Sequence, residues 1–599
     1  MKISLLKTSR NNFFLNKNLN KTECESYIFL GKDPLLSDYL DKILCHKIKK
    51  IEYLKDFVKI QYLYRDNYID FIDLNEKADF DNQWWKTRLS GKNPWISSTY
   101  FRFCQIVLIK NILKKFKKTE LNLLILIEED CVLRSVNELL KNNYRYKFYN
   151  KRHSDFSKLK LIFTGLVRRI LAIPLYLYKS IVYKIIFKSF NHTSFFNNNV
   201  FVFSFIDSRC FNDNNFNDPF LGKFLTKINI KKNISYIPVL INVSIKRLLL
   251  FRKWLSINNY SVSFLPYYIS IPNALFEIFK FNFFFKKVEN KYLHGINLKY
   301  LISRERLEEW SDFSLQNNLI TKLSTQIKKY SHNKLLIYPF ENQIWERNML
   351  SVFEQDVNVK IYAVQNAPAP KLSIRFYVSK KMIKFLPLPD AIFVTGNISY
   401  NNLVEFYGDK ILKKFSTSRK ILNSQYNSNT DSIRQNIMVA CSISNTESVE
   451  LILFVINTLR SYNNFNVTIV SHPLSNFNFI NFLQKIKAPS HIKLGKDYKN
   501  TIENSRYILF DSSTSGIEGL LNGLVPVRVV NKFSLHVNPS EYDSSYTKCV
   551  YNPGELISVL SSDIEFDNNY KEIALNYYEV DDSNELKRTI SELNFLNND

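Results

Sequence analysis

The chain has 599 residues, more than one hydrophobic core supports, so two or three domains are expected. A hydrophobic content of 45% with 15% aromatic residues excludes a largely disordered protein. The formal net charge of +27 suits a protein that binds phosphates, anionic lipid or acidic sugars. Nucleic acid is not an expected partner, because the sequence has no zinc-finger spacing, RNA-binding signature or long Lys/Arg block.

Residues 1–155 alternate short apolar runs with charged helical stretches, for example YIFLGKDPLLSDYLDKIL and FRFCQIVLIKNILKKF. This alternation predicts a small N-terminal α/β region without a recognisable chemical motif. The first residues, MKISLLKTSRNNFF, soon turn polar and do not read as a secretory signal. The seven cysteines lie far apart and form no Cys-x-x-Cys pair, which favours a reduced, cytoplasmic compartment without a thiolate zinc site.

The next segment, residues 156–198, is basic and strongly apolar, above all between residues 159 and 190. Five basic residues interrupt its apolar run: Arg168, Arg169, Lys179, Lys184 and Lys188. They do so before the run reaches the roughly 18 to 20 residues that span a bilayer. The pattern predicts a helix pair lying on a membrane surface, with a buried connecting helix as the alternative.

From residue 199 onward, short β-rich runs alternate with helical stretches. Eight runs are strand candidates: VFVFSFI, ISYIPVLI, KLLIYPF, VKIYAVQ, AIFVTG, NIMVACSI, NVTIVSH and RYILFDSS. Continuous apolar strands of this kind are typical of parallel sheets covered on both faces, so the fold class is α/β with two doubly wound Rossmann-like domains. A polar, Ser/Asn-rich stretch near residues 415–435 reads as the linker between an N-lobe (199–415) and a C-lobe (416–599).

In open parallel sheets, ligands bind outside the carboxyl ends of the strands. Three strand ends in the C-lobe carry candidate side chains: Ser442 and Ser444, then His472 and Pro473, then Ser512, Ser513 and Thr514. A helix N-terminus offers unpaired N–H groups and a partial positive charge, so the last of these loops is predicted to seat a phosphate or carboxylate. Ordinary helix capping is the alternative for each loop taken alone.

The order of these loops resembles the nucleotide-binding half of GT-B glycosyltransferases that use CMP-activated acidic sugars, namely bacterial sialyltransferases and Kdo transferases. The shared marks of those enzymes are a His-Pro motif and a Ser-Ser/Thr motif, here His472-Pro473 and Ser512-Ser513. The resemblance implies that the histidine and the serines contact the cytidylate phosphate. It also implies that Glu518, in the following GIEGLLNGLVPV, lies near the nucleotide, with a solvent-facing helix position as the alternative.

The N-lobe stretch LLIYPFENQIWERNML, followed by VKIYAVQNAPAP, resembles a group of bacterial surface-carbohydrate biosynthesis proteins. Their marks are a Tyr-Pro-x-Glu-Asn-Gln motif and a later strand that ends in Gln-His. The chain has Asn366 in place of that histidine, so this position lacks a titratable group and is expected to hydrogen-bond a sugar. The resemblance implies acceptor or sugar contacts by four residues: Asn342, Gln343, Gln365 and Asn366.

Glycosyl transfer passes through an oxocarbenium-like state, which needs a carboxylate near the anomeric carbon and help for the leaving phosphate. Glu341, at the end of the LLIYP run, is the predicted general base of an inverting enzyme, with a dipole-complementing helix residue as the alternative. Asp207, after VFVFSFI, is the candidate nucleophile of a retaining enzyme. Because no Asp-x-Asp pair follows a strand, we expect neither a metal site nor a cofactor, and a CMP-sugar donor in place of a diphosphate one.

The predicted function is transfer of an acidic sugar, Kdo or a related nonulosonic acid, from a CMP-sugar to a lipid-linked surface glycan such as lipopolysaccharide O-antigen or capsule. The expected location is the inner face of the cytoplasmic membrane, as a peripheral protein. Two alternatives stay open. One is a transferase that uses a nucleotide-diphosphate sugar or CDP-glycerol, and the other is a non-catalytic membrane-peripheral scaffold, which Asn366 favours.

Overall fold

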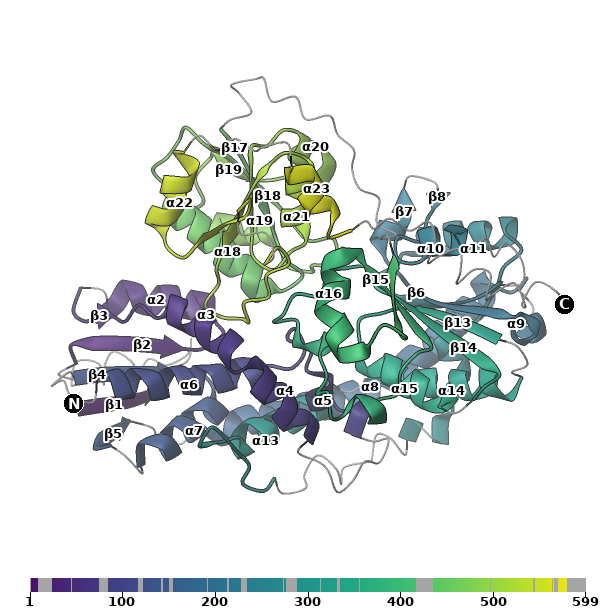
Figure 1. Ribbon diagram of the computed structural model, residues 1–599, viewed down its shortest axis with the longest axis horizontal. Coiled ribbons are helices and arrows are strands. Elements are labelled where there is room, and N and C mark those ends of the chain that lie inside the picture. Colours follow the sequence, from purple (N-terminus) through teal and green to yellow (C-terminus); the bar gives the residue numbers. More distant parts are fainter. Residues whose placement is uncertain are drawn as a thin grey trace.

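Three parallel β-sheets, with five, seven and six strands, form the framework of the computed structural model (Figure 1). Two short two-stranded sheets complete the strands of the described residues. The structure describes residues 2–8, 24–44, 46–74, 84–116, 122–141, 144–149, 154–190, 192–212, 215–227, 234–272, 274–275, 288–312, 314–330, 334–354, 356–415, 435–495, 497–541, 545–562, 564 and 569–578.

The N-terminal sheet has the order β3-β2-β4-β1-β5, and every pair in it is parallel. Its strands are β1 (Lys2–Lys7), β2 (Ser26–Leu30), β3 (Lys49–Lys50), β4 (Asn122–Ile127) and β5 (Tyr146–Tyr149). The surrounding helices include α2 (Pro34–Leu44), α3 (Leu54–Leu63), α4 (Arg65–Leu74), α6 (Thr99–Phe116) and α7 (Asp130–Lys141). Strand β2 is buried throughout, and so is all of β4 after its first residue, because helices cover both faces of the sheet. The predicted N-terminal α/β region is therefore confirmed.

The middle sheet has the order β10-β9-β6-β13-β14-β15-β16 and is also fully parallel. Its strands are β6 (Val200–Ile206), β9 (Ile234–Leu240), β10 (Ser261–Val262), β13 (Lys334–Pro339), β14 (Val359–Val364), β15 (Ala391–Thr395) and β16 (Leu412–Phe415). The main helices are α11 (Ile245–Ile257), α13 (Lys299–Ser311), α14 (Gln316–Lys329), α15 (Ile344–Phe353) and α16 (Gly396–Tyr407). The chain winds outward from β6, returns to β13 and winds outward again, so the topological switch point lies between β6 and β13.

The C-terminal sheet has the parallel order β19-β18-β17-β20-β21-β22, with its switch point between β17 and β20. Its strands are β17 (Asn436–Ala440), β18 (Asn466–Val470), β19 (Ile492–Leu494), β20 (Tyr507–Phe510), β21 (Val525–Val529) and β22 (Lys548–Val550). Its helices are α18 (Asn445–Leu459), α19 (Phe479–Lys485), α20 (Tyr498–Glu503), α21 (Ser515–Leu521), α22 (Pro553–Leu560) and α23 (Tyr570–Leu575). All eight predicted strands are present, which confirms the doubly wound α/β class, while residues 416–434 of the predicted linker lie outside the described residues.

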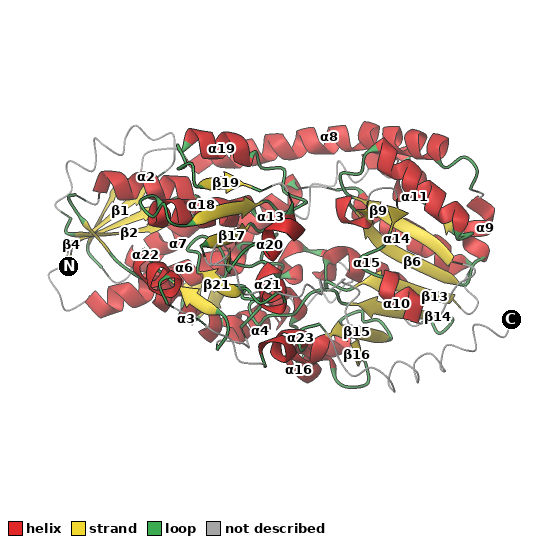
Figure 2. Ribbon diagram, turned by 90° about the horizontal axis from the view of Figure 1, so that it is seen from above, coloured by secondary structure: helices red, strands yellow, loops and turns green. Residues whose placement is uncertain are grey.

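Helix α8 (Ser154–Ile186) connects the N-terminal and middle sheets and runs along one long edge of the molecule (Figure 2). The prediction of a helix pair is wrong, because a single helix continues through Pro174. One face of α8 packs closely on α13, since a Cβ on Gly165 would lie 2.5 Å from the Trp310 ring. The helix is long and apolar enough to cross a membrane by length and composition, and 17% of its most apolar window is buried.

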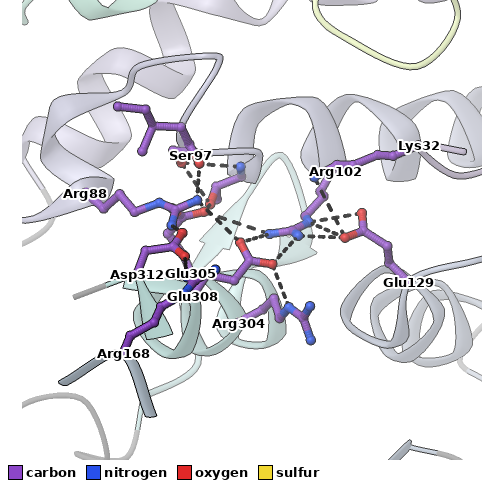
Figure 3. Close-up of polar contacts among 12 residues, drawn as sticks. Lys32, Arg88, Ser97, Arg102, Glu129, Arg168, Arg304, Glu305, Glu308 and Asp312 are labelled. Atoms are coloured by element: carbon purple, nitrogen blue, oxygen red, sulfur yellow. Dashed lines mark hydrogen bonds and ion pairs between the residues drawn. The ribbon is translucent and has the colours of Figure 1, made fainter. Parts of the chain in front are cut away.

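An ion-pair network closes the carboxyl edge of the N-terminal sheet against α13 (Figure 3). Arg102 of α6 pairs with Glu129, which follows β4, at 2.6 Å and with Glu308 of α13 at 2.7 Å. Arg88 pairs with Glu305 of α13 at 2.8 Å. One contiguous hydrophobic core runs beneath this network and includes Ile125 of β4 and Leu336 of β13. The N-terminal and middle sheets therefore fold around a shared interior.

The loop between β21 and β22 contacts both the N-terminal unit and the N-lobe. The backbone N–H of His536 donates to Gln61 Oε1 of α3 at 2.6 Å. The carboxylate of Glu541 accepts from the Tyr62 hydroxyl at 3.1 Å and from the backbone N–H of Lys371 at 2.6 Å. This loop thus joins the C-lobe to the N-terminal unit and to the N-lobe at neighbouring points.

Candidate functional site

A cleft of about 390 Å³ lies where the carboxyl ends of the middle and C-terminal sheets meet. The N-lobe lines it with Arg209, Pro219 and Phe220. The C-lobe lines it with several of the residues predicted from sequence, namely His472, Pro473, Ser513, Thr514 and Glu518. Side chains that follow β18 and β20 therefore meet side chains that follow β6 in one cavity.

The His472 ring is oriented by its own loop. Its Nδ1 accepts the backbone N–H of Leu474 at 3.1 Å, so the neutral imidazole carries its hydrogen on Nε2. The following Pro473 fixes its own φ and also lines the cleft. A cleft-lining imidazole with Nε2 as its donor is suited to contact an anionic oxygen.

The predicted anion seat on the helix N-terminus after β20 is not supported by the backbone geometry. Helix α21 has only seven residues, and its first N–H groups bond within the chain. The N–H of Ile517 donates to the Thr514 carbonyl at 3.0 Å, and the N–H of Ser515 donates to Ser513 Oγ at 3.2 Å. The hydroxyls of Ser513 and Thr514 line the cleft, so side chains, and not the helix N-terminus, are the groups presented there.

Three of the predicted hydroxyl residues, Ser442, Ser444 and Ser512, do not line the cleft. The hydroxyls of Ser442 and Ser512 both donate to Glu447 Oε2, at 2.6 Å and 2.5 Å, and so link the ends of β17 and β20 at the switch point. Ser444 caps α18 by accepting the N–H of Glu447. Glu447 is 3% exposed, so this cluster holds the strand ends together.

Glu518 lines the cleft, in contrast to the solvent-facing alternative. Its Oε2 accepts the Tyr498 hydroxyl at 2.7 Å. Tyr498 and Tyr578 add aromatic surface to the same cleft, opposite Phe220 of the N-lobe. The cleft thus combines aromatic surface with a cluster of polar groups.

Asp207 does not have the geometry of a nucleophile. Its side chain is fully buried, and its carboxylate accepts the Arg209 guanidinium at 2.6 Å and the Arg209 backbone N–H at 2.8 Å. The aspartate instead positions Arg209, whose side chain is 31% exposed and lines the cleft. Sequence reasoning missed Arg209. The sequence pattern that could have identified Arg209 is a basic residue two positions after Asp207, just beyond β6, one of the two strands at the N-lobe switch point.

Glu341 follows β13 on the other side of that switch point and is not among the residues that line the cleft. Its Oε2 accepts from Arg375 at 3.2 Å and from the side-chain amide of Gln343. Gln343 is the N-cap residue of α15, where Glu346 completes a capping box. Glu341 is 35% exposed, so its carboxylate is both oriented and accessible.

The predicted sugar-binding amides are mostly occupied within the protein. Asn342 is 5% exposed, and its amide donates to the Arg375 carbonyl at 2.6 Å and to the Tyr407 hydroxyl at 3.2 Å. Gln365 is fully buried and accepts the backbone N–H of Thr395 at 3.2 Å. Among the described residues, Gln365 Nε2 and Asn366 Oδ1 are buried without a hydrogen-bond partner. Neither Gln365 nor Asn366 lines the cleft.

Within the described part of the chain, no group of three or more His, Cys, Asp and Glu side chains is placed to hold a metal ion.

Several solved structures similar to this chain cover about two thirds of it. One is a UDP-GlcNAc 2-epimerase from Neisseria meningitidis bound to UDP-GlcNAc, with 13% identity, a TM-score of 0.39 and coverage of 67% of this chain and 100% of that chain. Another is S. aureus MnaA with UDP, with 13% identity, a TM-score of 0.40 and coverage of 67% and 96%. A third is the glycotransferase of kitacinnamycin, with 8% identity, a TM-score of 0.37 and coverage of 67% and 98%. No protein-family model and no curated protein matches the sequence.

Proposed function

We propose that the protein is a glycosyltransferase of the GT-B type that binds a nucleotide-activated sugar in the cleft between its two doubly wound lobes. The observation that carries this proposal is the meeting of Arg209 from the N-lobe with His472 and Ser513 from the C-lobe in one cavity. A guanidinium, an imidazole donor and hydroxyls are the groups that bind a phosphate. The aromatic side chains of the cleft offer surface for a base or ribose.

The leaving group of such a transfer is a nucleotide phosphate, and its developing charge needs donors that are already in place. Arg209 is held by Asp207 on one side of the cleft, and His472 is held by the Leu474 N–H on the other. Both are therefore oriented before a ligand arrives. Glu341, with its carboxylate oriented by Arg375, is the proposed general base that takes the proton of the acceptor hydroxyl.

At a finer level, the proposed donor is a CMP-activated acidic sugar, Kdo or a related nonulosonic acid. The proposed acceptor is a lipid-linked surface glycan such as lipopolysaccharide O-antigen or capsule. The His472-Pro473 and Ser512-Ser513 motifs support this choice by their resemblance to CMP-sugar transferases. A cytoplasmic protein at the inner face of the membrane would meet both substrates. A transferase that uses a diphosphate sugar or CDP-glycerol shares the same phosphate-binding groups.

Calorimetric titration of the full chain with CMP, CDP, UMP, UDP and CDP-glycerol separates these possibilities. Tighter binding of CMP than of UMP and of either diphosphate supports the CMP-sugar proposal, and transfer from CMP-Kdo is then measured directly. Preference for CDP-glycerol or UDP shifts the donor to the corresponding class. Absence of binding by every nucleotide overturns the enzyme proposal in favour of a scaffold.

A further inference from the structure

The outward face of α8 is apolar from Leu159 to Ile185. Six of its large apolar side chains are each at least 60% exposed: Leu159, Phe163, Ile170, Tyr178, Ile181 and Ile185. At 100° per residue, these positions fall on one side of the helix. An exposed helix face of a water-soluble protein is normally polar, so a continuous apolar strip of this length marks an interaction surface.

The opposite face of α8 is packed on the rest of the protein. Gly165 abuts the Trp310 ring, and the Arg169 guanidinium lies 4.7 Å from the centre of that ring. Farther along, Tyr183 of the helix and Phe187, just beyond its end, are buried in the core of the middle sheet. A helix that crossed a bilayer would have to give up these contacts over both halves of its length. The geometry is therefore that of a helix lying flat, with one face in the protein and one face outward.

The surroundings of the strip are basic. No acidic residue occurs between positions 159 and 190, whereas Lys179, Lys184 and Lys188 lie in the second half of that segment. Helix α11 follows the same pattern, since it has no acidic residue and its basic side chains are Lys246, Arg247, Arg252 and Lys253. The Arg252 guanidinium reaches Ser189 at 3.4 Å, which places α11 beside the end of α8 (Figure 2).

We propose that this face of α8, together with the basic side chains of α11, docks the protein on the surface of an anionic lipid bilayer. The apolar strip inserts among the acyl chains at the interface, and the lysines and arginines contact lipid phosphates. A second copy of the chain is the competing occupant. Two such faces would bring like charges together around the strip, so charge complementarity favours the lipid. The docking surface does not depend on the nucleotide cleft.

The test is flotation of the full-length protein with vesicles of phosphatidylcholine that contain phosphatidylglycerol, and with vesicles of phosphatidylcholine alone. The variant Phe163→Ser/Ile170→Ser/Ile181→Ser removes three exposed side chains of the strip. The matched control, Leu63→Ser/Val357→Ser/Ile480→Ser, removes three apolar side chains that are 72%, 87% and 58% exposed elsewhere on the molecule. We expect the strip variant to lose more than about tenfold in partitioning to the anionic vesicles and the control to retain it.

Four results would overturn the proposal. The first is an equal loss of vesicle binding in the control variant, and the second is equal binding of the wild type to uncharged vesicles. The third is a lipid-free dimer that the strip variant converts to a monomer. The fourth is resistance of the vesicle-bound protein to an alkaline wash, which marks a membrane-spanning helix. Because all substituted side chains are exposed, both variants are expected to keep the wild-type thermal midpoint. Nucleotide titration of the same proteins in lipid-free buffer reports on the cleft separately, so failure of one proposal is distinguishable from failure of the other.

Discussion

Ser512 and Ser513 are neighbours in the chain with separate tasks: the Ser512 hydroxyl donates to the buried Glu447 at 2.5 Å, and Ser513 lines the cleft. Ser513→Ala should weaken nucleotide binding by about threefold to tenfold and lower the unfolding free energy by no more than about 1 kcal/mol, because the partly exposed Ser515 N–H loses its acceptor. Ser512→Ala should lower the unfolding free energy by about 1 to 2 kcal/mol, because Glu447 loses a buried donor, with little change in binding. Calorimetry and urea unfolding measure the two effects. The reverse pattern would show that Ser512 is the ligand-facing residue.

Arg209→Met should weaken nucleotide binding by about tenfold to one hundredfold, since a charged hydrogen bond to phosphate is lost. Arg460→Met, at an exposed arginine on the C-lobe, is the matched control and should bind normally. Asp207→Asn should weaken binding less, because it only loosens Arg209, and should have no further effect when Arg209 is already Met. Loss of transfer in Asp207→Asn with full nucleotide affinity would restore Asp207 as a nucleophile.

Glu341→Gln should lower the transfer rate by more than about one hundredfold, because the amide cannot accept the acceptor's proton. The dissociation constant of the nucleotide should stay within about twofold of wild type, since Glu341 does not line the cleft. Glu354→Gln, at the end of α15, is the control and should change neither quantity. Transfer that persists within a few-fold in Glu341→Gln would remove this residue from the mechanism.

Gly396→Ala should detach the segment after α23 from the N-lobe. A Cβ at Gly396 would lie 2.5 Å from the Asn576 carbonyl oxygen, and the neighbouring Tyr578 lines the cleft. Gly408→Ala is a close control, because Gly408 also has a positive φ but a Cβ there would meet no atom of the described residues within 4 Å. Both variants carry the backbone strain of about 1 kcal/mol, and only Gly396→Ala adds a clash. Hydrogen exchange at residues 570–578 should rise in Gly396→Ala alone, together with weaker nucleotide binding.

The Arg102 network should make stability depend on pH in the acid range. Burial opposes ionisation of Glu129, but the charges of Arg102 and Lys32 outweigh it and lower the pKa of this carboxyl from 4.5 to about 2. A lowered pKa adds stability above the unfolded value of 4.5, here on the order of 3 kcal/mol, which is lost as the pH falls toward about 2.

Arg102→Met should therefore destabilise the protein strongly at pH 7, by about 3 to 5 kcal/mol, because buried carboxylates lose their partner. The difference from wild type should shrink as the pH falls below the usual Glu range. Arg304→Met is the control, since its partly exposed pair with Glu308 is worth little. Urea unfolding over a pH series measures both variants, and a pH-independent difference would mean that the lost stability is packing alone.

Eight strands of the two doubly wound lobes were predicted, because continuous apolar runs such as NIMVA have few alternatives to a covered parallel sheet. Strands β10, β16, β19, β21 and β22 were not predicted. The strand ends also indicated where a ligand binds, since switch-point geometry follows from strand order. The sequence does not show which way two adjacent hydroxyls point, and Ser512 and Ser513 differ in this respect only because Glu447 lies behind the turn. A helix pair was predicted for residues 159–190, but a single helix, α8, continues through Pro174.

The contacts between units could not be read from local patterns. Arg102 and Glu308 are 206 positions apart, and nothing near either residue indicates the other. For the same reason the burial of Asp207 was not foreseeable, because residues distant in the chain decide whether a strand end is covered. Long-range packing decided the role of these residues, and periodicity carries no information about it.

Glu541 binds Tyr62 of the N-terminal unit and Lys371 of the N-lobe with the two oxygens of one carboxylate. A rotation of the C-lobe that keeps both hydrogen bonds leaves Glu541 at a fixed position relative to the other two units. The lobes are also held at a second place, where the Asn576 carbonyl accepts the Ile398 N–H of α16 at 3.4 Å. In the proposed transferase, a motion of the C-lobe that opens the cleft would turn about these contacts, and the N-terminal unit would help to set its axis.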